Sequence, residues 1–343
     1  MNKAAHIVVM RLSAMGDVAM LVPVLRGLFE AQPELKVTLV SRPFFEPLFD
    51  EFDRLEFFGV DLQERHKGLA GLFRLYKDLK RSKPDGFADL HNVLRSKVVG
   101  LLFRLSGKPV AVLNKGRAEK KALTRKQNKI LKPLKHTTER YAEVFHRLGF
   151  ACQPIASQKS RLPLPLEIRE FLPADRRKAW IGLAPFASFP GKTYPLNQMK
   201  ELCLLLSKDY EVLLFSAPGK ETETISDWEN PAGGIYSMRH LGSLQNELIV
   251  IGQLDLMISM DSANGHLAAN FGVEVCTIWG LTHPYAGFGP VGQDERHWVL
   301  PDLDRFPLIP TSIYGNKVPD GYEKVMSTMS PESIYARVKT LLS

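Results

Sequence analysis

The sequence predicts an α/β protein with two doubly wound parallel sheets. Short apolar runs alternate with amphipathic segments of helical period, which is the pattern of βα units whose strands pair in parallel. This alternation stops in a proline-containing stretch, residues 150–178, and then starts again. A chain of 343 residues is also long for a single core. We therefore expect two domains, and two similar sheets facing one another would leave a cleft.

The first half begins with a strand at 5–10, a turn at 11–16 and an amphipathic helix at 17–31. Further strands are predicted at 36–41, 55–58, 86–90 and 109–113, and helices at 43–52, 67–81, 91–105 and 136–148. The same periods in the second half predict strands at 179–184, 211–216, 234–237, 254–260 and 273–279, and helices at 196–208, 221–228, 244–251, 266–271 and 331–342. The expected domains are 1–160 and 161–325, followed by a C-terminal helix within 326–343.

Composition and charge limit the class of protein. Hydrophobic and charged contents of 45% and 24% are those of a soluble globular chain, and no stretch approaches the roughly 20 apolar residues of a membrane span. The net charge of +8 favours an anionic partner: a nucleotide, a phosphorylated glycolipid, a membrane surface or a nucleic acid. Cys152, Cys203 and Cys276 are far apart, so neither disulfides nor a zinc site is indicated, and a reducing cytoplasm fits best.

The most informative stretch follows the strand at 254–260. Small and polar residues make a turn before His266, which opens a helix: Asp261, Ser262, Ala263, Asn264 and Gly265. Unpaired N–H groups at a helix start can hold a phosphate, although Asp and Ser are also ordinary helix caps and a histidine is often simply packed. A second small-residue turn, with Gly280 and Thr282, follows the next strand. Both turns would lie at the carboxyl ends of adjacent strands, where open α/β sheets bind ligands.

Four further charged residues could carry chemistry. Asp17 lies at the mouth of the first strand and could act as a general base, although an N-cap is the commoner role. Lys192, in a long turn after a strand, could neutralise a leaving phosphate or be merely solvated. Glu221 or Glu223 could hold a ribose hydroxyl or simply compensate a helix dipole.

Two other segments have open interpretations. Residues 115–135 contain nine Lys and Arg against only Glu119, which is either a solvated loop or a contact for an acidic partner. Aromatic residues are absent between these cations, which argues against single-stranded nucleic acid. Asp302 and Asp304 form a DxD that could chelate a divalent ion, but a surface loop is favoured there. No GxxxxGK[ST] or GxGxxG loop supports an ATPase or a dinucleotide enzyme.

Several of these motifs resemble glycosyltransferase family 9, the heptosyltransferases that build the inner core of lipopolysaccharide. Residues 11–18, RLSAMGDV, resemble the family's opening motif. Residues 261–268, DSANGHLA, with 280–282, GLT, resemble its D-S/T-G-x-x-H-L-A and G-x-T signature. The similarity covers nearly the whole chain in order and includes 89–96, 191–195 and 241–244.

The resemblance implies a GT-B fold, in which two Rossmann-like domains face one another and the last helix crosses back to the first domain. It implies inverting transfer from a nucleotide-sugar, typically ADP-heptose, to a lipopolysaccharide precursor at the cytoplasmic face of the inner membrane. Asp17 would deprotonate the acceptor, and Lys192 would stabilise the departing diphosphate without a metal or other cofactor. The other implied donor residues are Glu221 or Glu223 at the ribose, Leu241, Ser243 and Leu244 near the base, and Asp261 to His266 with Thr282 at the pyrophosphate.

The acceptor residues implied in the same way are Ser13, Gly16, Arg95, Lys120, Lys121 and Arg125. Two departures from the family pattern concern the phosphate turn: Ala263 replaces the usual glycine, and Gly265 replaces a bulkier residue. The alternatives are a GT-B transferase or epimerase that uses a UDP-sugar, and a catalytically inactive homologue that binds a polyanion or a glycolipid.

Overall fold

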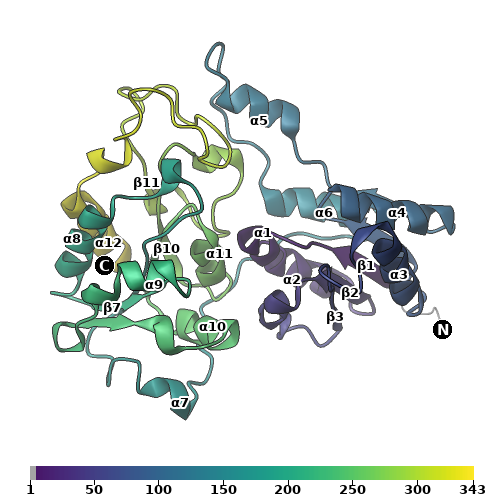
Figure 1. Ribbon diagram of the computed structural model, residues 1–343, viewed down its shortest axis with the longest axis horizontal. Helices are drawn as coiled ribbons and strands as arrows, with labels where there is room; N and C mark the ends of the chain where they lie inside the picture. The colour runs from purple at the N-terminus through teal and green to yellow at the C-terminus, as the bar shows by residue number, and fades with distance from the viewer. Residues whose placement is uncertain (1–4) are drawn as a thin grey trace. The chain divides into compact units, whose positions relative to one another are not determined.

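The computed structural model describes residues 5–343, which form two compact units. Unit 1 takes in the described residues up to Gly116 together with Lys135–Ile155, and unit 2 takes in Arg117–Leu134 and Ala156–Ser343. Each unit has its own parallel sheet and is described by itself (Figure 1).

Unit 1 contains a five-stranded parallel sheet in the order β3-β2-β1-β4-β5. Its strands are β1 (His6–Met10), β2 (Lys36–Ser41), β3 (Leu55–Gly59), β4 (Gly86–Asp89) and β5 (Val110–Val112). The α-helices are α1 (Met15–Ala19), α2 (Val22–Ala31), α3 (Gly68–Lys80), α4 (Leu94–Leu105) and α6 (Thr137–Arg147). The strand order reverses between β1 and β4, and such a switch point is where an open sheet of this kind binds ligands.

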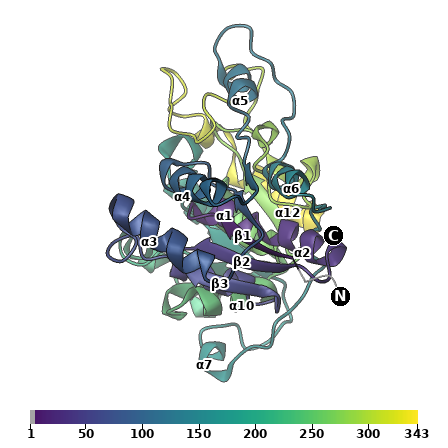
Figure 2. The ribbon, with the colours of Figure 1, turned by 90° about the vertical axis from the view of Figure 1, so that its right-hand side faces the viewer.

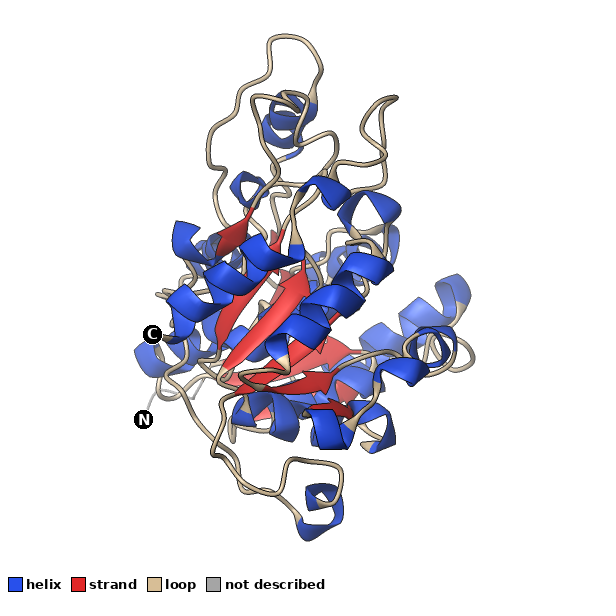
Figure 3. Ribbon diagram, turned by 90° about the vertical axis from the view of Figure 1, so that its left-hand side faces the viewer, coloured by secondary structure: helices blue, strands red, loops and turns tan. Residues whose placement is uncertain are grey.

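Unit 2 contains a six-stranded parallel sheet in the order β11-β10-β9-β6-β7-β8, which repeats the winding of unit 1. Its strands are β6 (Trp180–Ala184), β7 (Glu211–Leu214), β8 (Ile235–Ser237), β9 (Leu256–Met260), β10 (Glu274–Ile278) and β11 (Trp298–Val299). The helices are α5 (Arg117–Thr124), α7 (Leu166–Arg169), α8 (Leu196–Leu206), α9 (Lys220–Thr224), α10 (Leu244–Gln253), α11 (Ala263–Ala269) and α12 (Pro331–Leu342). Figure 3 shows the strands in red between layers of helices. The switch point of this sheet lies between β6 and β9.

The central strands of both sheets are apolar on both faces because helices cover both faces. Ile7 to Met10 in β1 and Leu256 to Ile258 in β9 are buried. Such continuous apolar runs are expected of parallel strands in doubly wound folds. The predicted α/β class is therefore confirmed in both halves of the chain.

The helix predicted at 17–31 is two helices in the structure, α1 and α2, separated at Met20 and Leu21. Pro23 lies in the first turn of α2. A proline has no N–H to donate to the preceding turn, so it ends one helix and is well placed near the start of the next.

Residues 117–134 and the C-terminal helix α12 both belong to unit 2. The Lys129 ammonium donates hydrogen bonds to the backbone oxygens of Leu308 and Pro310, 2.6 and 2.8 Å away, and α12 packs on α8. Sequence patterns give local structure, but they do not say which core a segment joins.

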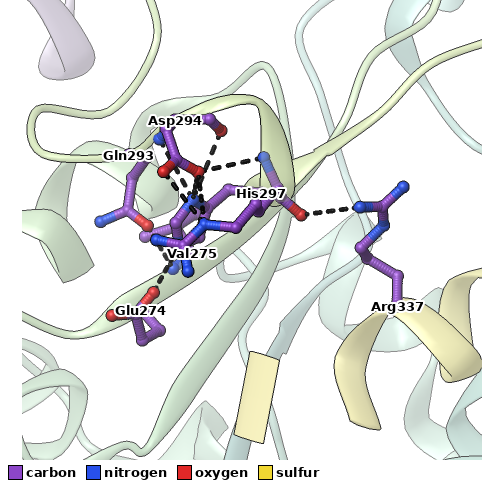
Figure 4. A network of polar contacts seen from close by, with 7 residues as sticks. Glu274, Val275, Gln293, Asp294, His297 and Arg337 are labelled. Carbon is purple, nitrogen blue, oxygen red and sulfur yellow. Dashed lines mark hydrogen bonds and ion pairs between the residues drawn. The ribbon is translucent and has the colours of Figure 1, made fainter. Parts of the chain in front are cut away.

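A network of hydrogen bonds stabilises the edge of the unit 2 sheet (Figure 4). The buried imidazole of His297 hydrogen-bonds Glu274 at the start of β10 and Asp294 in the preceding turn. Gln293 accepts from the Val275 N–H at 3.1 Å, and Arg337 of α12 donates to the Arg296 backbone oxygen at 3.2 Å. These bonds fix the short strand β11, which sequence periodicity did not reveal.

Within residues 5–343, no helix is long and apolar enough to cross a membrane, and no cluster of three or more His, Cys, Asp or Glu has the geometry to hold a metal ion. In the DxD segment, Asp302 accepts from the N–H groups of Asp304 and Arg305, which makes it a turn-forming residue. The three cysteines are free and buried, and burial raises the pKa of each thiol to about 12.

Candidate functional site

In unit 1, Asp17 lies at the switch point, just beyond the carboxyl end of β1. It is the third residue of α1, whose N-cap is Ala14, so it is not itself the cap. Its Oδ2 accepts from the Arg11 guanidinium at 2.5 Å and from the Ala14 N–H at 3.4 Å. Both contacts fall on one carboxylate oxygen, which leaves Oδ1 to receive a proton from a ligand.

Arg11 is the residue that orients Asp17, and it was not among the predicted site residues. Its side chain is buried, and it donates through Nη1 to the Leu90 backbone oxygen at 2.7 Å. The guanidinium therefore joins the carboxyl end of β1 to that of β4. The buried Tyr141 of α6 completes the support, because its hydroxyl donates to the Asp17 backbone oxygen at 3.1 Å. Only the tertiary fold brings Tyr141 to this position.

His91 follows β4 at the same switch point. Burial, reinforced by the positive charges of Arg11 and Lys115, lowers the pKa of its imidazole to about 4. The ring is therefore neutral at physiological pH, and its buried Nδ1 has no hydrogen-bond partner within the described chain. A neutral imidazole with an unused nitrogen is suited to hydrogen-bond a sugar hydroxyl.

Three of the predicted acceptor residues belong to unit 1. Ser13 lies in the turn between β1 and α1, Gly16 is a helical residue of α1, and Arg95 is exposed in the first turn of α4. All three follow the two strands that flank the switch point.

In unit 2, backbone hydrogen bonds tie together the turns that follow β6, β9 and β10. The Lys192 ammonium donates to the Asp261 backbone oxygen at 2.6 Å, and the Leu281 N–H donates to the Gly191 backbone oxygen at 2.7 Å. The turn at Lys192 is thus bonded to both of the other turns. Three turns that are far apart in the sequence form one cluster at the switch point.

This cluster contains an ammonium group and two unused hydroxyls. Lys192 lies 3.5 Å from the Asp261 carboxylate, and both side chains are mostly buried. The Ser262 and Thr282 hydroxyls are buried and make no hydrogen bond within residues 5–343. A buried hydroxyl without a partner costs free energy, so these groups indicate a polar ligand, and their chemistry fits phosphate oxygens.

The helix after β9 starts three residues earlier than predicted. Ser262 is its N-cap and Ala263 its first residue, so the first-turn N–H groups belong to Ala263, Asn264 and Gly265. Ala263 is helical and needs no positive φ, which explains why alanine is tolerated in place of glycine.

Gly265 and His266 are both buried residues of α11. A Cβ on Gly265 would lie 2.8 Å from the Ser259 hydroxyl and 3.2 Å from Pro290. The absence of a side chain at Gly265 therefore lets α11 lie close to the sheet. His266 is buried, with 7% of its surface exposed.

The residues expected near the ribose and the base are less well placed to contact a ligand than the residues of the cluster. Glu221 accepts from the Ala217 N–H at 2.9 Å and so closes its own turn, whereas Glu223 is exposed. Ser243 caps α10 by accepting from the Asn246 N–H at 3.1 Å. Leu241 and Leu244 are buried and offer little side-chain surface.

A loop at 309–316, in which the sequence analysis identified no candidate residue, also borders the cluster. The Thr311 N–H donates to the Leu281 backbone oxygen at 2.9 Å, and the Gly191 N–H donates to the Gly315 backbone oxygen at 3.1 Å. A Cβ on Gly315 would meet the Lys192 side chain at 3.1 Å. The buried Ser312 hydroxyl is unpaired within residues 5–343.

The cations of the basic segment are divided between internal and exposed positions. Lys120 lies 4.2 Å from the Phe288 ring centroid, and Lys129 is bonded to the loop that contains Pro310. Arg125 donates to the Asn128 backbone oxygen, and Lys121 is exposed on α5. Residues 117–134 of this segment belong to unit 2, and several of their cations remain at the surface.

Known proteins resemble this chain in sequence and in fold. The family model described as Glycosyltransferase family 9 (heptosyltransferase) matches residues 72–305. No curated protein gives a match. A solved glycosyl transferase of family 9 from Veillonella parvula has a TM-score of 0.75 at 18% identity, covering 100% of this chain and 98% of that one.

Two solved enzymes from E. coli have the same fold. ADP-heptose lps heptosyltransferase II has a TM-score of 0.67 at 17% identity, with 98% of both chains covered. Heptosyltransferase WaaC with ADP has a TM-score of 0.68 at 16% identity, with 98% of this chain and 99% of that chain covered. At identities this low, the structural similarity establishes the fold, which is GT-B, and does not identify the substrate.

Proposed function

Since this chain belongs to glycosyltransferase family 9, the heptosyltransferase family, we propose that it transfers a heptose from ADP-heptose to an anionic lipopolysaccharide precursor with inversion at the sugar carbon. The observation that carries the proposal is the cluster in unit 2. One ammonium, two unpaired hydroxyls and the N–H groups of a helix start are gathered at one switch point. That is a binding site for a diphosphate.

The leaving group of the reaction is a nucleoside diphosphate. Lys192 supplies positive charge to it, Ser262 and Thr282 donate hydrogen bonds, and the N–H groups of Ala263 and Asn264 add backbone donors. Negative charge grows on the diphosphate as the sugar bond breaks, so fixed donors stabilise the transition state more than the ground state. A cation in this position performs the role for which other enzymes recruit a metal ion.

Asp17 is the base of the reaction. Its Oδ1 takes the proton of the acceptor hydroxyl as that oxygen attacks the sugar carbon, while Arg11 holds Oδ2. Direct attack opposite the diphosphate inverts the configuration. Asp17 belongs to unit 1, and the residues proposed to bind the diphosphate belong to unit 2.

The acceptor is anionic and membrane-bound in this proposal, and the protein works at the cytoplasmic face of the inner membrane. Arg95 in unit 1 and the exposed Lys121 and Arg125 in unit 2 would contact acceptor phosphates, and His91 would bind a sugar hydroxyl. Lys120 already contacts Phe288, so we expect it to contribute less to acceptor binding than Lys121 and Arg125 do.

The donor is identified by incubating the protein with labelled ADP-heptose, ADP-hexose or UDP-hexose and a deacylated core acceptor. Transfer from ADP-heptose alone is expected. Preferential transfer from UDP-sugars would overturn the donor assignment, and product with retained configuration at the anomeric carbon would overturn direct displacement.

The catalytic roles are tested by Asp17→Asn and Lys192→Ala. Loss of a positioned general base lowers kcat by about 100- to 10,000-fold, so Asp17→Asn is expected to lose turnover in that range and to bind ADP as the parent does. Lys192→Ala is expected to weaken ADP binding and lower kcat together. Exposed Asp53→Asn and Lys208→Ala serve as matched controls.

An inactive polyanion-binding protein would behave differently. Inorganic polyphosphate would raise its Tm as much as ADP does, and Asp17→Asn would alter neither of these Tm shifts. Full turnover by Asp17→Asn would show that another group is the base.

A further inference from the structure

The outer face of the α3–α4 helix pair in unit 1 leaves large apolar side chains in solvent. We call this the α3–α4 face and define it by Leu69 and Phe73 of α3 with Leu94, Leu101 and Leu105 of α4. Their exposed fractions are 74%, 46%, 76%, 51% and 75%. Residues spaced by four or seven share one side of a helix, so each helix presents a stripe, not scattered apolar residues.

The two stripes are carried by one rigid support. Tyr76 of α3 and Phe103 of α4 meet edge to face with ring centroids 5.2 Å apart, and the helices lie side by side in Figures 1 and 2. The inward sides of both helices are already used, because Leu72, Val99 and Phe103 are buried in the core of unit 1. The exposed leucines are therefore additional to the apolar residues that the fold needs.

Positive charge surrounds these apolar side chains. Residues 68–83 and 94–108 contain nine Lys and Arg against one acid, Asp78, so their net charge of +8 equals that of the whole chain. Asp78 is ion-paired with Arg65 and Arg81, and residues 94–108 contain no acid at all. An apolar stripe between cations has the pattern of a helix that lies in the interface of an anionic bilayer.

The cations adjoin the apolar residues closely. The Lys77 ammonium lies 4.8 Å from the Phe73 ring centroid, and that of Lys80 lies 5.7 Å from the Tyr76 ring centroid. Lys97 and Arg104 share with Leu101 the wall of a cavity of about 290 Å³ between α4 and the edge strand β5, which is lined also by Asp89, Gly100, Val110 and Val112. Long cationic side chains of this kind keep their charge in water while their stems follow an apolar surface.

We propose that the α3–α4 face docks on an anionic lipid bilayer, with Leu101 and Leu105 entering the acyl boundary and Lys97 and Arg104 contacting phosphate headgroups. A protein partner is disfavoured because lysine is depleted at the centres of protein interfaces. A second copy of this chain is disfavoured because a symmetric contact would bring two faces of like charge together. The inference deepens the proposed function, since it rests on the acceptor being in a membrane, and it assigns the docking surface.

The test is co-flotation of the full-length protein with vesicles of phosphatidylcholine, alone or with about one third phosphatidylglycerol. Binding to the anionic vesicles only is expected, and it should weaken at high salt. Leu101→Ser/Leu105→Ser is expected to lower the partition coefficient at least about tenfold, and Lys97→Gln/Arg104→Gln by about 10- to 30-fold.

The matched control is Leu166→Ser/Leu204→Ser in unit 2, because these side chains are 77% and 51% exposed, close to the 75% and 51% of Leu105 and Leu101 in unit 1. This control should float as the parent does. Equal flotation of the parent and the Leu101→Ser/Leu105→Ser variant, or no binding to either vesicle, would overturn the proposal. A parent dimer that this variant converts to a monomer would identify a second copy as the occupant instead.

Flotation requires neither donor nor acceptor, so it separates this proposal from the proposed reaction. Asp17→Asn should bind vesicles as the parent does. Leu101→Ser/Leu105→Ser should retain transfer to the deacylated acceptor in solution and lose transfer to the same acceptor in vesicles.

Discussion

Individual residues outside the proposed reaction also have measurable behaviour, and Glu247 is the clearest case. It lies in the first turn of α10, and burial raises the pKa of its carboxyl group from 4.5 to about 7. The folded state therefore holds a proton that the unfolded chain has lost between these pH values. The free energy of unfolding falls as pH rises through this window, because above it the partly buried carboxylate is charged.

Glu247→Gln is expected to remove this pH dependence. The variant should match the parent in Tm near pH 4.5 and exceed it by a few degrees at pH 8, since a neutral amide needs no deprotonation. Glu332→Gln is the control, because Glu332 is also in a first helical turn but is exposed. Equal Tm differences at both pH values would show that burial of Glu247 does not govern stability.

At the scale of elements, the position of α11 determines how the diphosphate donors are presented. Gly265 permits its close approach to β9, and a Cβ there would lie 2.8 Å from the Ser259 hydroxyl. Gly265→Ala should therefore push the helix from the sheet, lower the free energy of unfolding by about 1–3 kcal/mol and weaken ADP binding. Calorimetry and ADP titration measure both effects.

Gly289→Ala is the comparison for that substitution, because a Cβ on Gly289 would meet nothing within 4 Å. It should leave both stability and ADP affinity near those of the parent. Normal ADP binding by Gly265→Ala would mean that the placement of α11 is not critical for the donor.

The attachment of the 117–134 segment to unit 2 depends on Lys129, whose ammonium binds two backbone oxygens. Lys129→Met leaves both carbonyls without that donor, so the segment should open more often. We expect thermolysin to cleave before the exposed Ile130 and Leu131 several-fold faster in this variant, as followed by mass spectrometry. Lys126→Met, which alters an exposed cation of the same segment, should not change the rate.

At the scale of the whole molecule, the cysteines report on the two units separately. Cys152 belongs to unit 1, while Cys203 and Cys276 belong to unit 2, and all three are buried with thiol pKa values raised to about 12. A thiol reagent at pH 8 should therefore modify none in the native protein and three in guanidinium. In a denaturant titration, the appearance of one reactive thiol would indicate that unit 1 unfolds first. The appearance of two reactive thiols would indicate that unit 2 unfolds first. Rapid labelling of the native protein would contradict the burial.

The two sheets repeat one winding, so the molecule has two equivalent switch points with different chemistry. Unit 1 places a carboxylate and a neutral imidazole at its switch point, and unit 2 places a cation, hydroxyls and helix N–H groups there. A base and a leaving-group site are the two parts that sugar transfer requires. A glycosyltransferase can therefore keep them on separate sheets.

Local patterns in the sequence predict every strand except β11, most helices and the turns that carry Asp17, Lys192, Asp261 and Thr282. These features depend on local periodicity and on small residues after apolar runs, which neighbouring positions encode. The family followed from the same motifs, because their order along the chain is specific.

The distant groups that support those residues are known only from the folded chain. Arg11 reaches Asp17 and Leu90 because β1 and β4 are paired, and the loop containing Ser312 borders Lys192 through backbone bonds across more than a hundred residues. The fold also placed 117–134 in unit 2 and gave Gly265 a packing role. Such contacts join residues far apart in the chain, and no local pattern of charge or hydrophobicity specifies them.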